Sequence, residues 1–382
     1  MLVLLAAGVL GALAQRASPR WSPAREPIDF GALILVTAAV AFFMFALREA
    51  VEQNFWTYPS ILLSIAVAGV HRPVRRYLDR AYPARAPIVA SLACLVLSSL
   101  AIRTTAAFPL AMIGALLAID SYLVRKPATP STLVAALGFG SAIGFLGAFD
   151  LGTLSAIAVL LVLPPMFLSE TAVPLESPPA PRRALYPGIL MAMPLAAFAI
   201  TSSYALSLRL QVQGDLLSMT AAAMFVLGPT LAVVVDRALP RLSPTIVRFG
   251  GLGLAVASAG LVLASVGTVP TTLALLGLFA SLSLAALAGL REFASPGGEA
   301  HHALATAIVF LPLIVLFFRL PPIVYSLTIA PLPLAVEYVL YTPTALIAAA
   351  ALVLVAVGWV RSRGRRVGKD YPGEAHGGPG GP

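Results

Sequence analysis

The residues with the clearest potential for specific chemistry form a phrase that occurs twice. The chain reads LDRAYPARAP at residues 78–87 and VDRALPRLSP at residues 235–244. Each copy places an aspartate beside an arginine, as Asp79-Arg80 and as Asp236-Arg237. A carboxylate on a short loop can bind the exposed amides at the start of a helix. Such chemistry joins segments of a protein to one another and does not transform a substrate.

Two further acids are suitable partners for the arginines of these loops. Asp120 lies at the end of one apolar run, and Glu292 lies just beyond another. We expect Arg80 or a neighbouring arginine to form an ion pair with Asp120. Glu292 is the corresponding acid for Arg237 or its neighbours. The alternative is that Asp79 and Asp236 only stiffen a tight turn.

Groups that could serve an enzyme are scarce. The nearest candidate is the sequence EAHH, which ends in His301 and His302, but adjacent histidines point to different sides of a helix. The chain has no glycine-rich phosphate loop with its lysine. The lone Cys94 allows neither an internal disulfide nor a cysteine-based metal site. We therefore expect no enzymatic activity, no cofactor and no metal.

The elements that must position these residues are membrane-spanning helices. The chain is 59% hydrophobic and only 11% charged, whereas soluble proteins carry roughly 25% charged residues. Apolar runs recur that are long enough to cross a bilayer as helices. The sequence predicts an all-α polytopic protein with twelve spans, at residues 30–47, 54–70, 86–102, 107–124, 131–149, 152–168, 187–207, 216–235, 245–266, 270–290, 303–319 and 339–360.

The distribution of basic residues predicts the orientation of these spans. With the start of the first span in the cytoplasm, most of the 25 Lys and Arg residues fall on the cytoplasmic side, as the positive-inside rule requires. Four lie outside: Arg48, Arg103, Arg209 and Arg319. The carboxyl terminus is then cytoplasmic too, and the protein lies in the cell membrane. The net charge of +9 is explained by the basic residues that set this orientation. We therefore expect no nucleic acid partner.

Two stretches complicate the assignment of spans. Residues 319–338 are apolar but contain four prolines, which favours an outer loop over a thirteenth span. The first 14 residues are apolar but lack the basic start of a signal peptide. A short extra span or a helix on the membrane surface suits them better than a cleaved signal.

The two copies of the repeated phrase follow the second and the eighth predicted span. The spacing between them carries spans 1, 2 and 3 onto spans 7, 8 and 9, so we expect two pseudo-symmetric six-helix halves with parallel orientation. The predicted parts are a segment with a basic linker at 1–27, the halves at 28–168 and 187–361, a central cytoplasmic loop at 169–186 and a tail at 362–382. We expect Asp79 and Asp236 each to reach a helix start in the opposite half, near His301–His302 and near Ser131.

This organisation resembles the major facilitator superfamily, whose loops after spans 2 and 8 carry an Asp-Arg motif with further basic residues. Asp79-Arg80 with Arg85, and Asp236-Arg237 with Arg241, match that motif. The resemblance implies that these loops hold the two halves together while the cytoplasmic side is closed. The predicted cytoplasmic latch consists of Asp79, Arg80, Asp120, Asp236, Arg237 and Glu292.

The match to the family's motif is partial. Arg75 and Ala232 stand where the family has a glycine four residues before the aspartate, and Tyr82 and Leu239 replace the glycine after it. The fifth span also lacks the Gly-Pro pair of the family's antiporters, which puts that mode of transport in doubt.

In transporters with parallel repeats of this kind, spans 1, 4, 7 and 10 line a central cavity. The candidate cavity residues in those spans are Phe43, Met44, Met112, Met193, Ser202, Tyr204 and Ser281. Because they carry no charge, they suit a small uncharged or amphipathic organic solute moved by alternating access. Protons are an optional further partner, although no carboxylate lies near mid-span. The alternative is a non-transporting membrane protein of the same architecture, such as a receptor or an assembly factor.

Overall fold

The computed structural model describes about half of the chain, and every structural statement below is confined to that half. The described residues are 29–53, 86–101, 104–123, 128–146, 215–238, 242–265, 267–294 and 303–308, with shorter pieces between 63 and 78 and at 159–160, 164–165 and 188–192. The predicted latch residues Asp79 and Arg80 lie outside them, as do Met193, Ser202 and Tyr204.

All regular elements in the described ranges are α-helices, which confirms the predicted fold class. The helices with defined bounds are α2 (Phe30–Gln53), α4 (Ala86–Leu100), α5 (Ala107–Leu123), α6 (Pro130–Leu146), α10 (Asp215–Ala238), α11 (Pro244–Ala264) and α12 (Thr268–Ala294). They correspond to predicted spans 1, 3, 4, 5, 8, 9 and 10. The twelve-span count itself stays a prediction.

Two of these helices are long and apolar enough to cross a membrane. The stretches Pro244–Val262 of α11 and Thr268–Glu292 of α12 meet both criteria, and shorter apolar stretches of 10 to 17 residues lie in α2, α4, α5 and α6. Since a helix rises about 1.5 Å per residue, the 27 residues of α12 extend beyond a hydrocarbon core of about 30 Å. The excess at its end carries Arg291 and Glu292 into the more polar layer.

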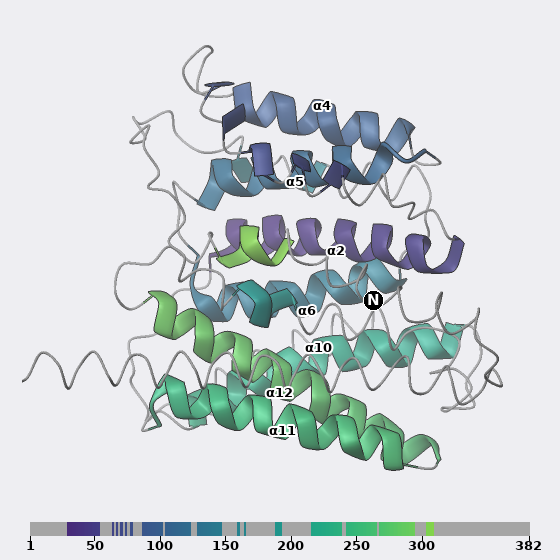
Figure 1. Ribbon diagram of the computed structural model, residues 1–382, viewed down its shortest axis with the longest axis vertical. Coiled ribbons are helices and arrows are strands. Elements are labelled where there is room, and N and C mark those ends of the chain that lie inside the picture. Colours follow the sequence, from purple (N-terminus) through teal and green to yellow (C-terminus); the bar gives the residue numbers. More distant parts are fainter. Residues whose placement is uncertain are drawn as a thin grey trace, which may run out of the picture.

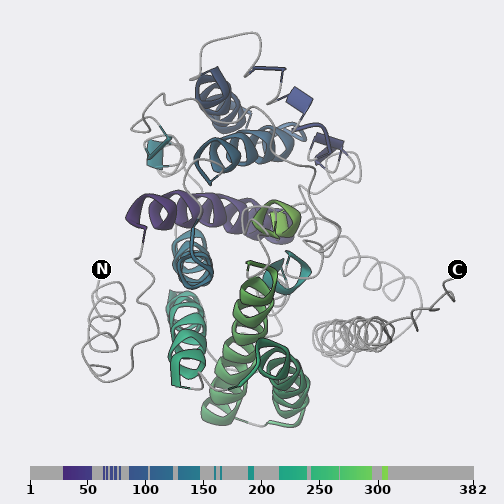
Figure 2. The ribbon, with the colours of Figure 1, turned by 90° about the vertical axis from the view of Figure 1, so that its left-hand side faces the viewer.

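The helices form a stack in which each one packs on the next (Figure 1). From one end to the other the order is α4, α5, α2, α6, α10, α12 and α11, and each neighbouring pair is in contact. Figure 2 shows the same order from the side. The described helices of the first predicted half thus meet those of the second chiefly where α6 packs on α10, with a smaller contact between α6 and α12.

Glycines allow the close approach of α6 to both of its neighbours. A Cβ placed on Gly140 or Gly144 would lie 2.5 Å from the Thr37 carbonyl oxygen or 2.4 Å from that of Ala41, both in α2. One on Gly138 would lie 2.7 Å from the carbonyl oxygen of Phe225 in α10. Small residues at such spacing let helix backbones approach in membranes. Gly140 and Gly144 are therefore close-packing positions between α6 and α2.

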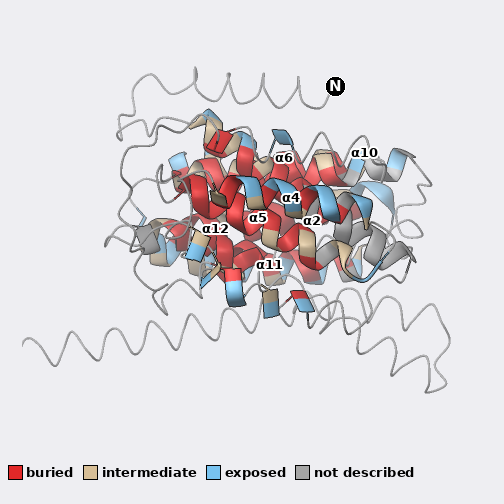
Figure 3. Cartoon of the chain, turned by 90° about the horizontal axis from the view of Figure 1, so that it is seen from above, coloured by how far each residue is buried: buried red, intermediate tan, exposed pale blue. Residues whose placement is uncertain are grey.

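Burial distinguishes the inner helices from the outer ones (Figure 3). α5 and α12 are buried along most of their length, whereas α4 exposes Val89, Val96 and Leu100. On its other face α4 binds α5 through Ser91, whose hydroxyl donates to the Gly114 carbonyl at 2.7 Å. An exposed apolar face opposite a buried polar contact fits a helix that faces lipid.

Polar groups fix the ends of two helices. The Asp29 carboxylate accepts hydrogen bonds from the amide of Gly31 at 2.9 Å and from the hydroxyl of Tyr122 at 3.1 Å, so it caps α2 and ties it to α5. Ser243 caps α11 by accepting from the Ile246 amide. Gly267, with φ +99°, supplies the left-handed turn between α11 and α12.

Candidate functional site

The charged residues at the ends of the second-half helices form ion pairs. Asp236, in the last turn of α10, pairs with Arg291 near the end of α12. The Asp236 side chain is buried, at 7% exposure, and the Arg291 side chain is one-third exposed. Because the pair is largely withdrawn from water, its charge-assisted hydrogen bonding is stronger than that of a surface pair.

A second ion pair joins the same end of α12 to α11. The Arg248 Nη1 atom lies 2.6 Å from the Glu292 Oε2 atom. Since Arg291 and Glu292 are adjacent, the two pairs hold α10 and α11 to one end of α12. The neighbouring Arg237, which the sequence placed in the latch, is exposed.

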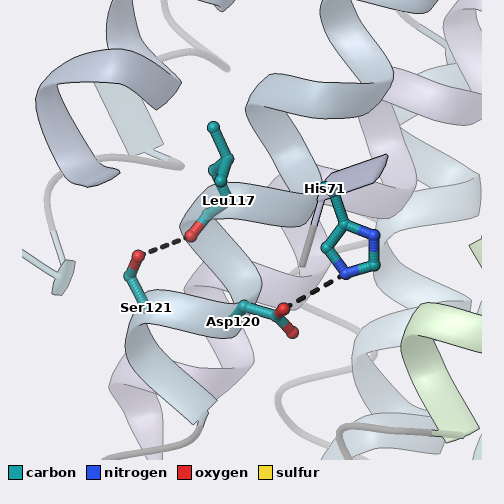
Figure 4. A network of polar contacts seen from close by, with 4 residues as sticks. All are labelled: His71, Leu117, Asp120 and Ser121. Carbon is teal, nitrogen blue, oxygen red and sulfur yellow. Dashed lines mark hydrogen bonds and ion pairs between the residues drawn. The ribbon is translucent and has the colours of Figure 1, made fainter. Parts of the chain in front are cut away.

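The acidic residue predicted for the first half, Asp120, has a different kind of partner. Its Oδ2 atom lies 3.2 Å from the Nε2 atom of His71, and both side chains are buried, at 4% and 5% exposure. Figure 4 shows the two side chains facing one another across the space between α5 and the helical residues around His71. The adjacent Ser121 hydroxyl donates instead to the Leu117 carbonyl of its own helix, at 2.6 Å.

Under the predicted division into halves, the two polar pairs join corresponding pairs of predicted spans. His71 and Asp120 connect predicted spans 2 and 4, and Asp236 and Arg291 connect spans 8 and 10. The positions of acid and base are exchanged between the halves. The second-half base is an arginine, and the first-half base is a histidine.

The structure brings the predicted latch residues into contacts within one half. The contacts described for Asp236, Glu292 and Asp120 are with Arg291, Arg248 and His71. The expected meeting of Asp236 with the start of α6 near Ser131 stays a prediction. So do the contacts of Asp79 and Arg80, which lie outside the described residues.

The candidate cavity residues that are described lie in helix packing. Met44 of α2 contacts α6, with its Cβ 2.8 Å from a Cβ placed on Gly144. Met112 of α5 is fully buried in the same apolar core. The Ser281 hydroxyl donates to the Gly277 carbonyl of its own helix. Phe43 lies in α2, where only its backbone is described.

One buried hydroxyl differs from its neighbours. The hydroxyls of Ser121, Ser141 and Ser281 each donate to the carbonyl four residues earlier in the helix. Ser283 of α12 is fully buried, yet within the described part of the protein its Oγ atom has no hydrogen-bond partner. A buried hydroxyl without a partner is unfavourable, so Ser283 is a group that a solute or a water molecule could satisfy.

Metal chemistry has no evident centre in the described ranges, where no cluster of three or more His, Cys, Asp and Glu residues occurs. The described polar residues offer charge-assisted contacts between helices, in pairs that can open and close. These are the chemical capabilities of the site.

Sequence reasoning missed three of the six residues in these pairs. Arg248 and Arg291 were counted only as basic residues that set orientation, and His71 falls one residue beyond the predicted end of span 2. Two signals were available. His71 is the sole histidine in the first predicted half. Arg291 directly precedes Glu292, which the sequence analysis placed in the latch.

Comparison with known proteins finds similarity in structure only. No family model matches the chain, and no curated protein sequence matches it. A solved structure of a bacterial homologue of the iron transporter ferroportin, in an outward-facing state with soaked iron, is similar with a TM-score of 0.57 at 14% identity. A variant of the E. coli fucose:proton symporter FucP is similar with a TM-score of 0.53 at 13% identity.

The similarity extends over most of each molecule. Both comparisons cover 86% of this chain and 97% of the solved chain. The two solved proteins are an iron transporter homologue and a fucose:proton symporter. The protein therefore shares the overall fold of these two solved proteins.

Proposed function

We propose that this protein is a secondary transporter that moves a small uncharged or amphipathic organic solute across the cell membrane by alternating access. The observation that carries the proposal is the fold, which matches two transporters over nearly their whole length. The proposal includes the predicted halves at 28–168 and 187–361 and the central loop at 169–186.

The composition of the inner helices supports the solute class. α12 carries no charged residue between Thr268 and Leu290, and α5 carries only Asp120. The polar groups that remain in the middle of α12 are hydroxyls, including the unsatisfied one of Ser283. A charged solute needs a fixed counter-charge in a membrane interior, whereas an uncharged or amphipathic one is served by hydroxyls and apolar surface.

The contact between α6 and α10 supports alternating access, because it is where the two sets of described helices meet. Gly138 allows the close approach there, and movement of one half against the other must change this contact. The latch of Asp79, Arg80, Asp120, Asp236, Arg237 and Glu292 would stabilise one of the end states.

Transport by proteoliposomes that contain the purified protein tests the proposal directly. A panel of uncharged, amphipathic, anionic and cationic solutes is offered with and without a pH gradient. We expect uptake of at least one uncharged or amphipathic solute and none of the charged ones. Ser283→Ala should reduce that uptake while leaving the melting temperature unchanged or raising it slightly, because the variant loses no hydrogen bond and removes an unsatisfied buried hydroxyl.

A variant pair separates carrier movement from leakage. Gly138→Leu fills the contact between α6 and α10 and should abolish uptake. Gly253→Leu, on an exposed face of α11 with nothing within 4 Å, should retain it. If no solute is moved by folded protein, a receptor or an assembly factor of the same architecture becomes the better explanation.

A further inference from the structure

Pro229 interrupts the backbone hydrogen bonding of α10 in the interior of the helix. A proline has no amide hydrogen, so residue 229 cannot donate to the carbonyl four residues earlier, and its ring crowds that carbonyl. Sharp bends in helices occur chiefly at such prolines. We propose that Pro229 is a hinge, at which the 215–228 part of α10 changes its angle to the 230–238 part during the conformational change of this carrier. The inference rests on the proposed transport function and adds the bending element to it.

The position of Pro229 distinguishes it from the other prolines in the helices with defined bounds. Those prolines stand in the first turn of a helix, where an amide has no acceptor within the helix and a proline is well tolerated. They are Pro87 in α4, Pro109 in α5, Pro130 in α6, Pro244 in α11 and Pro270 in α12. Among these helices, α10 is therefore the one whose interior loses a hydrogen bond to a proline.

The 230–238 part of α10 is fixed to its neighbours by charge. Asp236 pairs with Arg291 of α12. Arg291 stands beside Glu292, which pairs with Arg248 of α11. Because the Asp236 carboxylate is buried, its separation from Arg291 is unfavourable. This part of α10 therefore moves together with α11 and α12.

The 215–228 part of α10 has contacts of a different kind. Leu216 is exposed, and the Thr220 hydroxyl donates to the Leu216 carbonyl of its own helix at 2.8 Å. Toward α12, the ring of Phe225 packs on that of Phe279, with 5.3 Å between the ring centroids. Because apolar contacts are non-directional, they allow a change of angle that the ion pair of the 230–238 part would resist.

The first predicted half touches α10 at the hinge itself. In the stack of helices, α10 lies between α6 and α12 (Figure 1). A Cβ placed on Gly138 of α6 would lie 2.7 Å from the Phe225 carbonyl oxygen and 2.8 Å from the Pro229 Cγ atom. On the other side, one placed on Gly228 would lie 2.9 Å from the Phe279 Cβ atom. Two close contacts thus hold α10 at the level of Pro229, and movement of α6 against α12 is taken up by bending there.

Hydrogen bonding next to the proline also favours a bend. The Thr230 hydroxyl donates to the Val226 carbonyl at 2.6 Å. Serine and threonine side chains that bind the carbonyl four residues earlier often bend helices. Pro229 and Thr230 act on the successive carbonyls of residues 225 and 226, so both loosen the same turn of α10.

Two pairs of spin labels in nanodiscs test the hinge without any solute. In a Cys94→Ala background, the first pair is Leu216→Cys with Leu261→Cys, and the second is Arg237→Cys with Ile246→Cys, all at exposed positions. The first pair joins the start of α10 to the end of α11, and the second joins the opposite ends of the same helices. We expect a broader distance distribution for the first pair than for the second. Equal widths would overturn the proposal.

A variant that restores the amide at position 229 should remove the movement. Pro229→Ala should narrow the distribution of the first label pair, leave that of the second unchanged and raise the melting temperature, since proline is the least favourable residue in a helix interior. The matched control is Pro244→Ala, which replaces a first-turn proline of α11 and should leave both distributions as they are in the original protein. A higher melting temperature with an unchanged first distribution would make Pro229 a purely structural residue and contradict the hinge.

Hydrogen exchange provides a second measurement, which needs no variant. The amides of residues 230–233 should exchange faster than those of residues 254–257 in α11, a stretch with a similar mixture of buried and exposed positions. The expected difference is up to about tenfold, which corresponds to the net contribution of one backbone hydrogen bond. Equal rates in the two stretches contradict a loosened turn at Pro229.

The outcomes also separate the hinge from the proposed function. Solute uptake at the original rate by Pro229→Ala, with the first label distribution narrowed, leaves the carrier function intact and shows that the bend is not part of it. A first distribution that is broad in the original protein and narrow in Pro229→Ala, in a protein that moves no solute of the panel, retains the hinge and removes the carrier function.

Discussion

At the scale of single residues, the Asp236–Arg291 pair is the contact whose loss should be easiest to measure. Asp236→Asn removes the charge from a buried position and leaves Arg291 with a weaker partner. Loss of a hydrogen bond to a charged group costs about 1.5–3 kcal/mol, and the partial exposure of Arg291 favours the lower end. We expect a reduced melting temperature in detergent.

The neighbouring arginine provides the control for this variant. Arg237→Gln alters an exposed side chain and should leave the melting temperature almost unchanged. The double variant Asp236→Asn, Arg291→Gln should lose less than the sum of its single variants, because the two residues act as one contact. Additive losses would show that the ion pair makes no contribution of its own.

At the scale of helices, the close packing of α2 on α6 is the contact least able to accept larger side chains. In Gly140→Leu even the Cβ would lie 2.5 Å from a backbone oxygen of α2, so the helices must separate. Overpacking of this kind costs about 1–3 kcal/mol. We expect a lower melting temperature and a lower yield of folded protein.

The same substitution on the outer face of α11 is the matched test. Gly260 has nothing within 4 Å, and leucine is a better helix former than glycine by up to about 1 kcal/mol. Gly260→Leu should therefore leave stability unchanged or raise it slightly. Equal losses for both leucine variants would argue that glycine acts through helix flexibility rather than through packing.

The helices were predictable from the sequence because each is a long apolar run that ends at a turn residue. The starts of α4 at Ala86 and α5 at Ala107 agree with the prediction, and α11 starts one residue before its predicted span. The helices α2 and α12 extend further than predicted at their carboxyl ends. Both continue through charged residues, which hydropathy assigns to a loop but which a helix carries well outside the hydrocarbon layer.

The side-chain pairs were less predictable because they depend on distances between helices. From the sequence, Asp120, Asp236 and Glu292 were predicted to form contacts with basic residues. It did not predict that His71 would meet Asp120, because the rotation of two neighbouring helices is set by packing rather than by hydropathy. It also left Met44, Met112 and Ser281 as cavity candidates, since burial against a helix and burial against a solute produce the same sequence pattern.

At the scale of the whole molecule, the remaining prediction is the side of the membrane on which each end of the helix stack lies. The cytoplasmic side should carry the loop before α11, and the outer side should carry the turns between α4 and α5 and between α11 and α12. Because the chain has 1 cysteine, a Cys94→Ala background permits single-cysteine labelling. The three test positions 104, 242 and 268 are exposed. Leu242→Cys should react with an impermeant thiol reagent only from the cytoplasmic side, whereas Thr104→Cys and Thr268→Cys should react only from the outside.

Reaction of Leu242→Cys and Thr104→Cys from the same side would contradict the alternation of α4, α5 and α11 across the membrane. Opposite sides with the reverse orientation would instead retain the helix order and overturn the assignment that the positive-inside rule gives.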